Sequence, residues 1–414
     1  MTTDTLRQVW LQDARAADLA SWLIDAAIVG QPQLAILEAY CEKLVEMGVP
    51  LMRVHVTQTA LHPVYGGVGF DWHQTQAPVR HEYAHTEEAP ENWLVSPFFH
   101  MMSNGLSVYR ERIGDATAPS RFPVLNEMRA LGATDYLALA RLFDDSEDGE
   151  PVGLDDRREG AIVSWMSQAA DGFSEADILL IRATFPSLCL TLKSGTHQQT
   201  AEDLLGIYLG RDAGRRVLSG EIQRGSSRWI DAVICYFDLE GFTSMSRRIE
   251  GEALIAMLND YFGLVVTRIE EHGGNVLKFM GDGLLAIFDR ELLSDASDRA
   301  LRMATALDDK MAGHSSARSA KGLPILGYTM ALHAGRVLYG NIGADERLDF
   351  TVIGPEVNLA ARLADMHRPL GQHVIVSETL AHDVKDPPVD LVSLGRYMLR
   401  GVDQPQELFT IYKG

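Results

Sequence analysis

The chain has 414 residues, which is enough for two or three domains with cores of their own. Its 57 acidic and 37 basic residues give a net charge of −20, which argues against a nucleic-acid or anionic-membrane partner because such partners select for basic patches. Three scattered cysteines (Cys41, Cys189 and Cys235), no apolar run of about 18 residues and no signal-peptide pattern predict a cytoplasmic protein without disulfides or a membrane span.

The first part of the chain has a mixed α and β pattern. Residues 33–47 carry apolar side chains at helical spacing and stop at Gly48, and residues 52–56 alternate as a strand does. A Gly- and His-rich stretch covers residues 65–85. Further strand-like pieces are expected at residues 135–142 and 160–166, separated by an acidic loop at 144–150.

A long helix is predicted to begin after Ser174, because Ser174 and Asp177 frame a capping box before an apolar helical face. Pro186 lies inside this pattern and predicts a kink or an interruption. Residues 201–222 are rich in helix formers but contain three glycines, at 206, 210 and 214. We therefore expect a broken helical connector there rather than a long coiled coil.

Histidines are concentrated in the first domain, where six of the thirteen fall within 46 residues. A metal, haem or pH sensor would need ligands at close spacing. Only His81 and His85 come near such a spacing, and neither lies in a convincing helix. The favoured interpretation is therefore that these are solvated loop histidines: His55, His62, His73, His81, His85 and His100.

Two carboxylates in the second half of the chain each follow an apolar, strand-like run. Asp238 follows residues 230–237, and Asp282 follows residues 276–279 in a Gly-Asp-Gly turn. Mg²⁺ takes one or two carboxylates from a protein and its other oxygens from phosphates and water, so this pair indicates nucleotide-polyphosphate chemistry. The alternative is two unrelated turn aspartates, which for Asp282 alone is the simpler explanation.

The segment between the two aspartates predicts how they meet. Apolar residues from Leu254 to Ile269 recur as one face of a long helix that ends at His272-Gly273-Gly274. Strand, helices and a Gly-Asp-Gly hairpin give a βααββ start. Asp238 and Asp282 should then lie together across neighbouring strands of one sheet.

Four separated blocks in this order make residues 229–414 resemble the class III nucleotidyl cyclase catalytic domain. They are Phe237–Thr243, Lys278–Asp282, Leu332–Val337 and Thr351–Arg362. The resemblance implies an α+β chain whose C-terminal domain has a ferredoxin-like, palm-type fold. Residues 1–195 look, more loosely, like a GAF-type sensory domain, with a PAS-like or unrelated α/β module as the alternative, and residues 196–228 form a helical linker.

The same resemblance assigns the metal and phosphate contacts. Two Mg²⁺ or Mn²⁺ ions per active site would be held at Asp238, Leu239 and Asp282, one of them lowering the pKa of the ribose 3′-hydroxyl. Backbone amides leading through Gly241, Phe242 and Thr243 into a helix would wrap a phosphate. Glu240 is expected to point outward.

Base recognition is implied for Lys278 and Thr351. A lysine ammonium donates to N1 of adenine, and a threonine hydroxyl accepts from the 6-amino group, whereas guanine would want a carboxylate in place of Lys278. ATP is therefore favoured over GTP.

The remaining assignments concern the reacting phosphate. Asn358 and Arg362 lie four residues apart on one helix face and are implied to orient the ribose and to stabilise charge on the α-phosphate. Arg400 stands where the family usually has a triphosphate-binding Lys, and the two are not equivalent in geometry. Thr329 stands where some members carry a phosphate-contacting Arg.

Together these inferences predict an adenylate cyclase that converts ATP to 3′,5′-cyclic AMP and pyrophosphate. In this family the metal aspartates come from one subunit and the base-reading and transition-state residues from the other, so a homodimer with two composite sites is expected. An unknown small-molecule or protein signal would act through the N-terminal domain. The alternatives are a guanylate cyclase and a catalytically silent, signal-binding homodimer.

Overall fold

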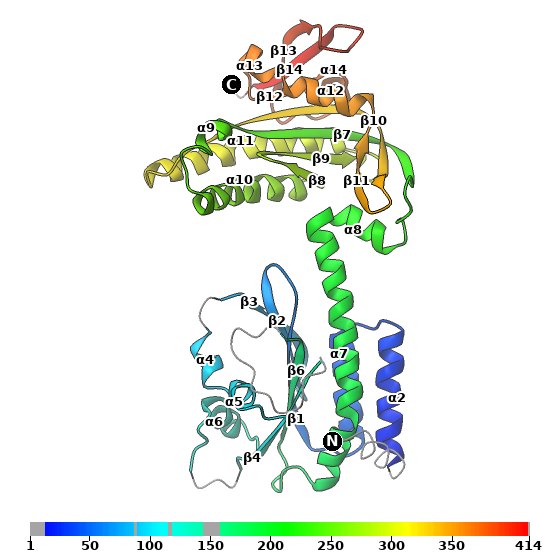
Figure 1. The fold of residues 1–414 in the computed structure, drawn as a ribbon, viewed down its shortest axis with the longest axis vertical. Coiled ribbons are helices and arrows are strands. Elements are labelled where there is room, and N and C mark those ends of the chain that lie inside the picture. The colour runs from blue at the N-terminus through cyan, green and yellow to red at the C-terminus, as the bar shows by residue number, and fades with distance from the viewer. Residues whose placement is uncertain (1–12, 87–88, 115–117, 144–157, 413–414) are drawn as a thin grey trace. The chain divides into compact units, whose positions relative to one another are not determined.

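The chain divides into two compact units. The computed structural model describes residues 13–86, 89–114, 118–143 and 158–412. The N-terminal unit is Met1–Leu204 and the C-terminal unit is Leu205–Gly414, so the division falls within the predicted linker. The acidic loop expected at 144–150 lies outside the described residues. Each unit is a mixed α and β structure (Figure 1).

The N-terminal unit is built on one antiparallel sheet of six strands in the order β3-β2-β1-β6-β5-β4. Helices α2, α3 and α7 share a core with one face, and α4, α5 and α6 border a second cluster on the other. The elements are α2 (Ala14–Ile28), α3 (Gln33–Glu46), β1 (Leu51–Thr59), β2 (Tyr65–His73), β3 (Gln76–Ala84), α4 (Glu91–Leu94), α5 (Pro97–Ser103), β4 (Val108–Arg112), α6 (Pro123–Ala130), β5 (Asp135–Leu142), β6 (Gly160–Ser167) and α7 (Glu175–Leu209).

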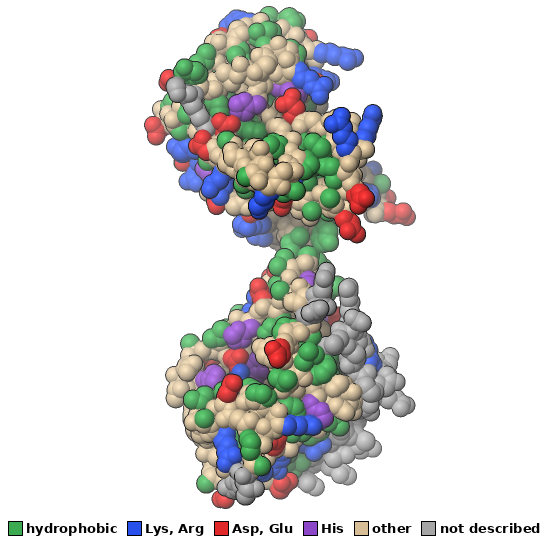
Figure 2. Space-filling model, turned by 90° about the vertical axis from the view of Figure 1, so that its left-hand side faces the viewer, with side chains coloured by type: hydrophobic (Ala, Val, Ile, Leu, Met, Phe, Trp, Pro, Cys, Tyr) green, Lys and Arg blue, Asp and Glu red, His purple; other side chains and the backbone are tan. Residues whose placement is uncertain are grey.

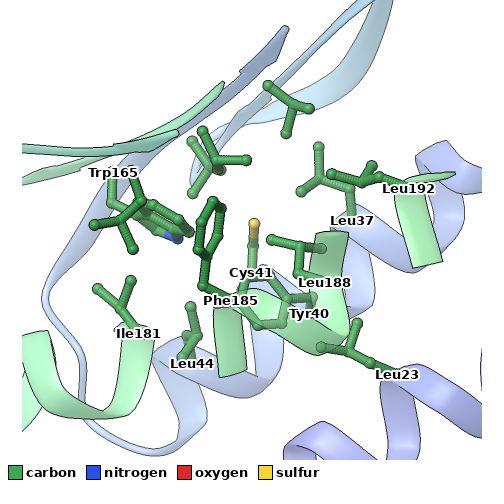
Figure 3. Packing of buried hydrophobic residues seen from close by; sticks show 14 of the residues in the cluster. Leu23, Leu37, Tyr40, Cys41, Leu44, Trp165, Ile181, Phe185, Leu188 and Leu192 are labelled. Carbon is green, nitrogen blue, oxygen red and sulfur yellow. The ribbon is translucent and has the colours of Figure 1, made fainter. Parts of the chain in front are cut away.

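Aromatic and aliphatic side chains fill the larger core of this unit (Figure 3). Trp165 of β6 meets Phe185 of α7 edge to face, with ring centroids 6.0 Å apart. The free thiol of Cys41 is buried beside them. Burial also raises the pKa of the Cys189 thiol, to about 12. These cysteines are packing residues and are not poised for redox chemistry.

The structure corrects the predictions for the histidine-rich stretch. Residues 65–85 form the β2–β3 hairpin, so His73 and His81 lie on strands. His55 lies on β1, where its Nδ1 is 3.0 Å from Asp71 Oδ2, and His81 Nε2 is 3.2 Å from the same oxygen. Solvated loop histidines are therefore the wrong interpretation for these positions, because Asp71 provides a partly buried acidic partner.

Helix α7 is longer than predicted. Its capping box is confirmed, since Asp177 N–H donates to Ser174 Oγ and Ser174 N–H donates to Asp177. The helix runs through Pro186 without interruption, because burial of Phe185 and Leu188 on either side offsets the one lost hydrogen bond. It also passes Gly206, and the predicted connector breaks only at Gly210, whose φ is +85°.

Helix α7 is also the one described helix that is long and apolar enough to cross a membrane by length and composition. Within its apolar window, however, 61% of the residues are buried inside the protein. Such burial is what the core helix of a soluble protein shows.

The C-terminal unit is built on an eight-stranded sheet. Seven strands follow the order β13-β14-β12-β10-β7-β9-β8, and β11 pairs with the end of β10. The elements are α8 (Arg211–Leu218), β7 (Ser227–Glu240), α9 (Phe242–Met245), α10 (Gly251–Glu271), β8 (Asn275–Met280), β9 (Gly283–Asp289), α11 (Ala296–Ala320), β10 (Gly327–Ala344), β11 (Arg347–Ile353), α12 (Pro355–Ala364), α13 (His367–Leu370), β12 (Val374–Ser377), α14 (Glu378–Asp383), β13 (Asp390–Tyr397) and β14 (Gln406–Tyr412). The predicted βααββ start is present.

Strand β7 lies at the centre of this sheet and is covered on both faces. Alternate residues such as Val233 and Phe237 share a cluster with α10 and α11, whereas Ile230 and Ile234 share one with α8 and α12. Double coverage explains the continuous apolar run in the sequence. Packing on both faces therefore holds the end of β7, which carries Asp238, in a fixed position.

Candidate active site

The two predicted metal carboxylates meet at one end of the sheet. Asp238 on β7 is in register with Gly283 of β9, the residue after Asp282, and the Leu239 N–H donates to the Asp282 carbonyl at 3.0 Å. Strand β7 continues to Glu240, so Asp238 lies within the strand and not after it as predicted. Pairing with β10 on the other side, where Asp238 opposes Thr329, extends the strand.

Two glycines make the turn around Asp282 possible. Gly281 has a φ of +72°, a conformation that side chains with a Cβ rarely adopt. A Cβ on Gly283 would lie 2.6 Å from the Phe237 carbonyl oxygen and 2.8 Å from Asp238 Oδ1. The glycine therefore leaves the space that the Asp238 carboxylate occupies.

A pocket of about 210 Å³ opens beside the two carboxylates. It is lined by Asp238, Leu239, Glu240, Gly241, Phe242, Thr243, Ser244, Asp282, Thr329, His367 and Arg368. Burial among these groups raises the pKa of Asp238, the negative charge of Asp282 raises it further, and His367 and Arg368 act in the opposite direction. Two crowded carboxylates whose charges repel form a site that favours a bound cation.

The donor set fits a divalent metal. Across the described ranges, no three His, Cys, Asp or Glu side chains are grouped so that they could hold a metal ion. The two carboxylates of Asp238 and Asp282, with Leu239 beside them at the pocket, are the groups that would hold Mg²⁺ or Mn²⁺ together with phosphate oxygens and water. That division of ligands is the usual one for Mg²⁺ at nucleotides.

The predicted phosphate-binding turn borders the same pocket. Gly241 has a φ of +87° and leads into the short helix α9. Gly241, Phe242 and Thr243 all line the pocket, as predicted for phosphate contacts. Glu240 lines it too, which corrects the expectation that it points outward, because its strand position beside Gly327 keeps it at the pocket rim.

Lys278 and Thr351 lie outside this pocket, on β8 and β11. The Lys278 ammonium is 3.3 Å from Asp349 Oδ2, and Asp349 precedes Thr351 by two residues on β11. Thr351 is only 5% exposed, and its hydroxyl has no hydrogen-bond partner within the described part of the chain. A buried hydroxyl without a partner is costly unless a ligand supplies one.

The last three predicted residues, Asn358, Arg362 and Arg400, are exposed and lie outside the pocket. Asn358 and Arg362 lie on α12, as predicted, and Arg362 is 3.4 Å from Asp365 of the helix end. Arg400 is exposed in the turn between β13 and β14. One copy of the chain thus places the metal residues at the pocket and leaves Asn358, Arg362 and Arg400 elsewhere.

Two further groups of polar side chains in this unit were not predicted from the sequence. His367 and Arg368 of α13 line the pocket beside the carboxylates. At the start of α12, Glu356 Oε2 is 2.6 Å from Nε2 of the fully buried His333, whose Nδ1 is 3.2 Å from the Thr379 hydroxyl. The spacing of these residues in the sequence does not indicate that either group forms, although His333 belongs to the block Leu332–Val337.

On the face of the C-terminal unit that Figure 2 shows, no broad patch of one charge is visible. In the upper part of Figure 2, acidic and basic side chains are interspersed, with histidine side chains among them. A nucleotide would therefore be held by the local groups of the pocket, as the net charge predicts.

Residues 226–413 match the family model for the adenylate and guanylate cyclase catalytic domain. This part of the chain is therefore a class III adenylate/guanylate cyclase catalytic domain, as the four blocks predicted.

Similar proteins bear related names. The chain is 30% identical over 207 residues to adenylate cyclase 1 of Rhizobium meliloti (strain 1021), covering 50% of this chain and 31% of that protein. It is 32% identical over 167 residues to an adenylate cyclase of Anabaena cylindrica, covering 40% of this chain and 33% of that protein. The chain thus spans about a third of these relatives' length. Among solved structures, the adenylyl cyclase CyaB from P. aeruginosa matches with a TM-score of 0.42 and 26% identity, covering 45% of this chain and 96% of that one.

Proposed function

We propose that this protein is an adenylate cyclase that converts ATP to 3′,5′-cyclic AMP and pyrophosphate. The observation that carries the proposal is the pocket at the end of β7, where Asp238, Asp282 and the turn at Gly241 lie together. The reaction needs in-line attack of the ribose 3′-oxygen on the α-phosphorus, so positioning and charge stabilisation dominate. Bound divalent metal would activate the 3′-hydroxyl and neutralise phosphate charge.

ATP is proposed as the substrate because of the groups on β8 and β11. The Lys278 ammonium forms an ion pair with Asp349, with Nζ and Oδ2 3.3 Å apart. That ammonium can donate a hydrogen bond to N1 of adenine. The partnerless Thr351 hydroxyl can accept from the 6-amino group. Guanine presents an N–H donor at N1, which would face the donating Lys278 ammonium, so a carboxylate would suit guanine better at this position.

A homodimer is proposed because the two halves of the chemistry lie on different surfaces of one chain. Large apolar side chains are exposed beside the residues that are absent from the pocket. Phe279 is 54% exposed next to Lys278, Ile353 is 44% exposed near Thr351, and Met398 is 64% exposed near Arg400. Such residues favour burial by a second subunit, which would bring Asn358 and Arg362 to the metal pair.

The N-terminal unit is proposed to be a GAF-like regulatory domain in a cytoplasmic protein. Its six-stranded antiparallel sheet with helices along both faces supports this proposal. Its ligand would be a small molecule or a protein signal. The buried, free cysteines accord with a reducing compartment.

The test is an assay of the purified protein with Mg²⁺ or Mn²⁺ and either ATP or GTP. Cyclic AMP and pyrophosphate formed from ATP at a higher kcat/KM than cyclic GMP from GTP would support the proposal. The reverse preference indicates a guanylate cyclase, and no product from either indicates a silent homodimer. Mixing inactive Asp282→Ala and Asn358→Ala chains should restore one good site per heterodimer, and no rescue would contradict the composite site.

A further inference from the structure

The pocket beside the metal carboxylates carries two side chains that can be cationic. Of the described residues that line it, only His367 and Arg368 belong to the Lys, Arg and His group. Both lie in α13, which follows α12 directly. The pocket residue on β10 that opposes Asp238 is Thr329, which has no charge. Among the described residues that line the pocket, α13 is therefore the source of positive charge for a bound ligand.

Arg368 is available for such a ligand. It is exposed, and no carboxylate of the described chain lies within ion-pair distance of it, whereas Arg362 is paired with Asp365 at 3.4 Å. Its position is nevertheless close to the site, because Arg368 lines the same pocket as Asp238 and Asp282. A carbonyl oxygen only accepts hydrogen bonds, so His367 Nδ1 donates to the Ala364 carbonyl oxygen. No hydrogen bond of His367 Nε2 is found within the described part of the chain.

The charge balance of the pocket requires a cation from the protein or the solvent. The three acidic residues that line the pocket, Asp238, Glu240 and Asp282, already give it a negative potential, and a nucleoside triphosphate adds several negative charges. Divalent metal ions offset part of this charge. A guanidinium offers two parallel N–H donors that match phosphate oxygens, so an exposed arginine at the rim is well suited to the outer phosphates.

We propose that Arg368 binds the β- and γ-phosphates of the nucleotide held at Asp238 and Asp282 of its own subunit, with His367 beside it. This proposal rests on the proposed function and adds a phosphate contact to it. It also assigns different sites to Arg362 and Arg368, which are six residues apart in the sequence. Arg368 serves the site of its own chain, and Arg362 serves the site of the partner subunit.

The first experiment measures phosphate binding in the full-length dimer. Arg368→Ala should raise the KM for ATP and the inhibition constant of inorganic tripolyphosphate about 10- to 100-fold, the range expected for a lost charge-assisted hydrogen bond. Arg368→Lys should recover part of the loss. Arg302→Ala, on α11 and paired with Asp295, is the matched control and should change neither constant. Unchanged tripolyphosphate inhibition in Arg368→Ala would overturn the proposal.

The second experiment tests which subunit's site Arg368 serves. When Asp282→Ala chains are mixed with Asn358→Ala chains, the one intact metal pair lies on the Asn358→Ala chain. Adding Arg368→Ala to that chain should raise the KM of the rescued activity. Adding it to the Asp282→Ala chain should have no effect, and the opposite pattern would overturn the assignment.

Failure of the proposed function would look different. If the wild-type protein forms no cyclic nucleotide, calorimetric titration of tripolyphosphate with Mn²⁺ still reports binding at the pocket. Weaker binding in Arg368→Ala than in Arg302→Ala would then support the phosphate contact without the cyclase activity. Equal binding in the two variants would contradict it.

Discussion

In the N-terminal unit, charged side chains on the sheet satisfy one another, whereas in the C-terminal unit the polar groups near the sheet end do not. Asp71 accepts from Arg53 Nε at 2.8 Å and from His55 at 3.0 Å, with His81 at 3.2 Å. Burial acts to raise the pKa of Asp71, but the hydrogen bond from His55 and the nearby positive charges lower it overall. This cluster is complete without a ligand.

At the candidate site of the C-terminal unit, three groups lack a favourable partner. Asp238 faces the like charge of Asp282, Thr351 has a buried hydroxyl without a partner in the described structure, and Arg368 has no ion pair there. Satisfied networks stabilise a fold, while unsatisfied groups held by a rigid frame are typical of a site that awaits its ligand. Substitutions should therefore affect stability in the first unit and activity in the second.

The largest effect is expected for Asp282→Ala. Removing one of the two metal carboxylates should lower kcat/KM for ATP at least about 1,000-fold. The thermal unfolding midpoint should not fall, because the change relieves repulsion at Asp238. Initial rates of cyclic AMP formation and differential scanning fluorimetry measure the two quantities. A clear loss of thermal stability would mean that Asp282 is a structural residue.

The matching change in the N-terminal unit is Asp135→Ala. Asp135 is fully buried, is 2.8 Å from Arg110 and accepts the Phe173 N–H at 3.0 Å. Its loss should lower the free energy of unfolding by about 3 kcal/mol, because the buried Phe173 N–H and the partly buried Arg110 guanidinium lose their acceptor.

Urea denaturation followed by the fluorescence of tryptophans in that unit, such as Trp165, measures this change. The control is Glu82→Ala, which breaks the exposed pair with Arg80 and should cost less than about 0.5 kcal/mol. Equal losses in the two variants would contradict the importance of the buried pair.

A smaller effect is expected for Lys278→Ala. Loss of a charged donor to adenine should lower kcat/KM for ATP about 10- to 100-fold. Asp349→Asn keeps the Lys278 ammonium but removes its ion pair, so kcat/KM for ATP should fall only a few-fold. Rates with ATP and GTP should be compared, because an equal fall for both nucleotides would show that Lys278 does not read the base.

The smallest effect is a pH dependence of stability at His333. Burial lowers the pKa of His333 although Glu356 acts to raise it, so the unfolded chain binds the proton more readily than the folded chain. Stability should then be constant above the unfolded pKa of about 6.5 and fall as the pH drops below it. Melting temperatures between pH 7.5 and 5.5 should show a shallower fall for His333→Gln, and an unchanged slope would contradict this origin.

Much of the site could be predicted because its parts follow from local patterns. The apolar run of β7, the helix before His272 and the Gly-Asp-Gly turn fix the order strand, helices, hairpin. That order alone brings Asp238 and Asp282 together. The helical spacing of Asn358 and Arg362 predicted that both lie on one helix, and the structure places them on α12.

The parts that could not be predicted depend on tertiary packing. Arg368 reaches the pocket only because α13 follows the end of α12, and no local periodicity encodes that turn. The β2–β3 hairpin was missed because its glycines and histidines hide the alternation of a strand. Helix α7 exceeds its predicted length because burial of the residues around Pro186 overrides the low helix propensity of proline.

The missing side chain at Gly283 limits how the proposed metal site can be redesigned. An engineer can exchange the acidic groups for others and tune which ion is held. Even a methyl group at position 283, however, would collide with the main chain of β7 and with the Asp238 carboxylate. Variant libraries aimed at altered metal use should therefore keep this glycine fixed and draw their diversity from the loop that follows Glu240.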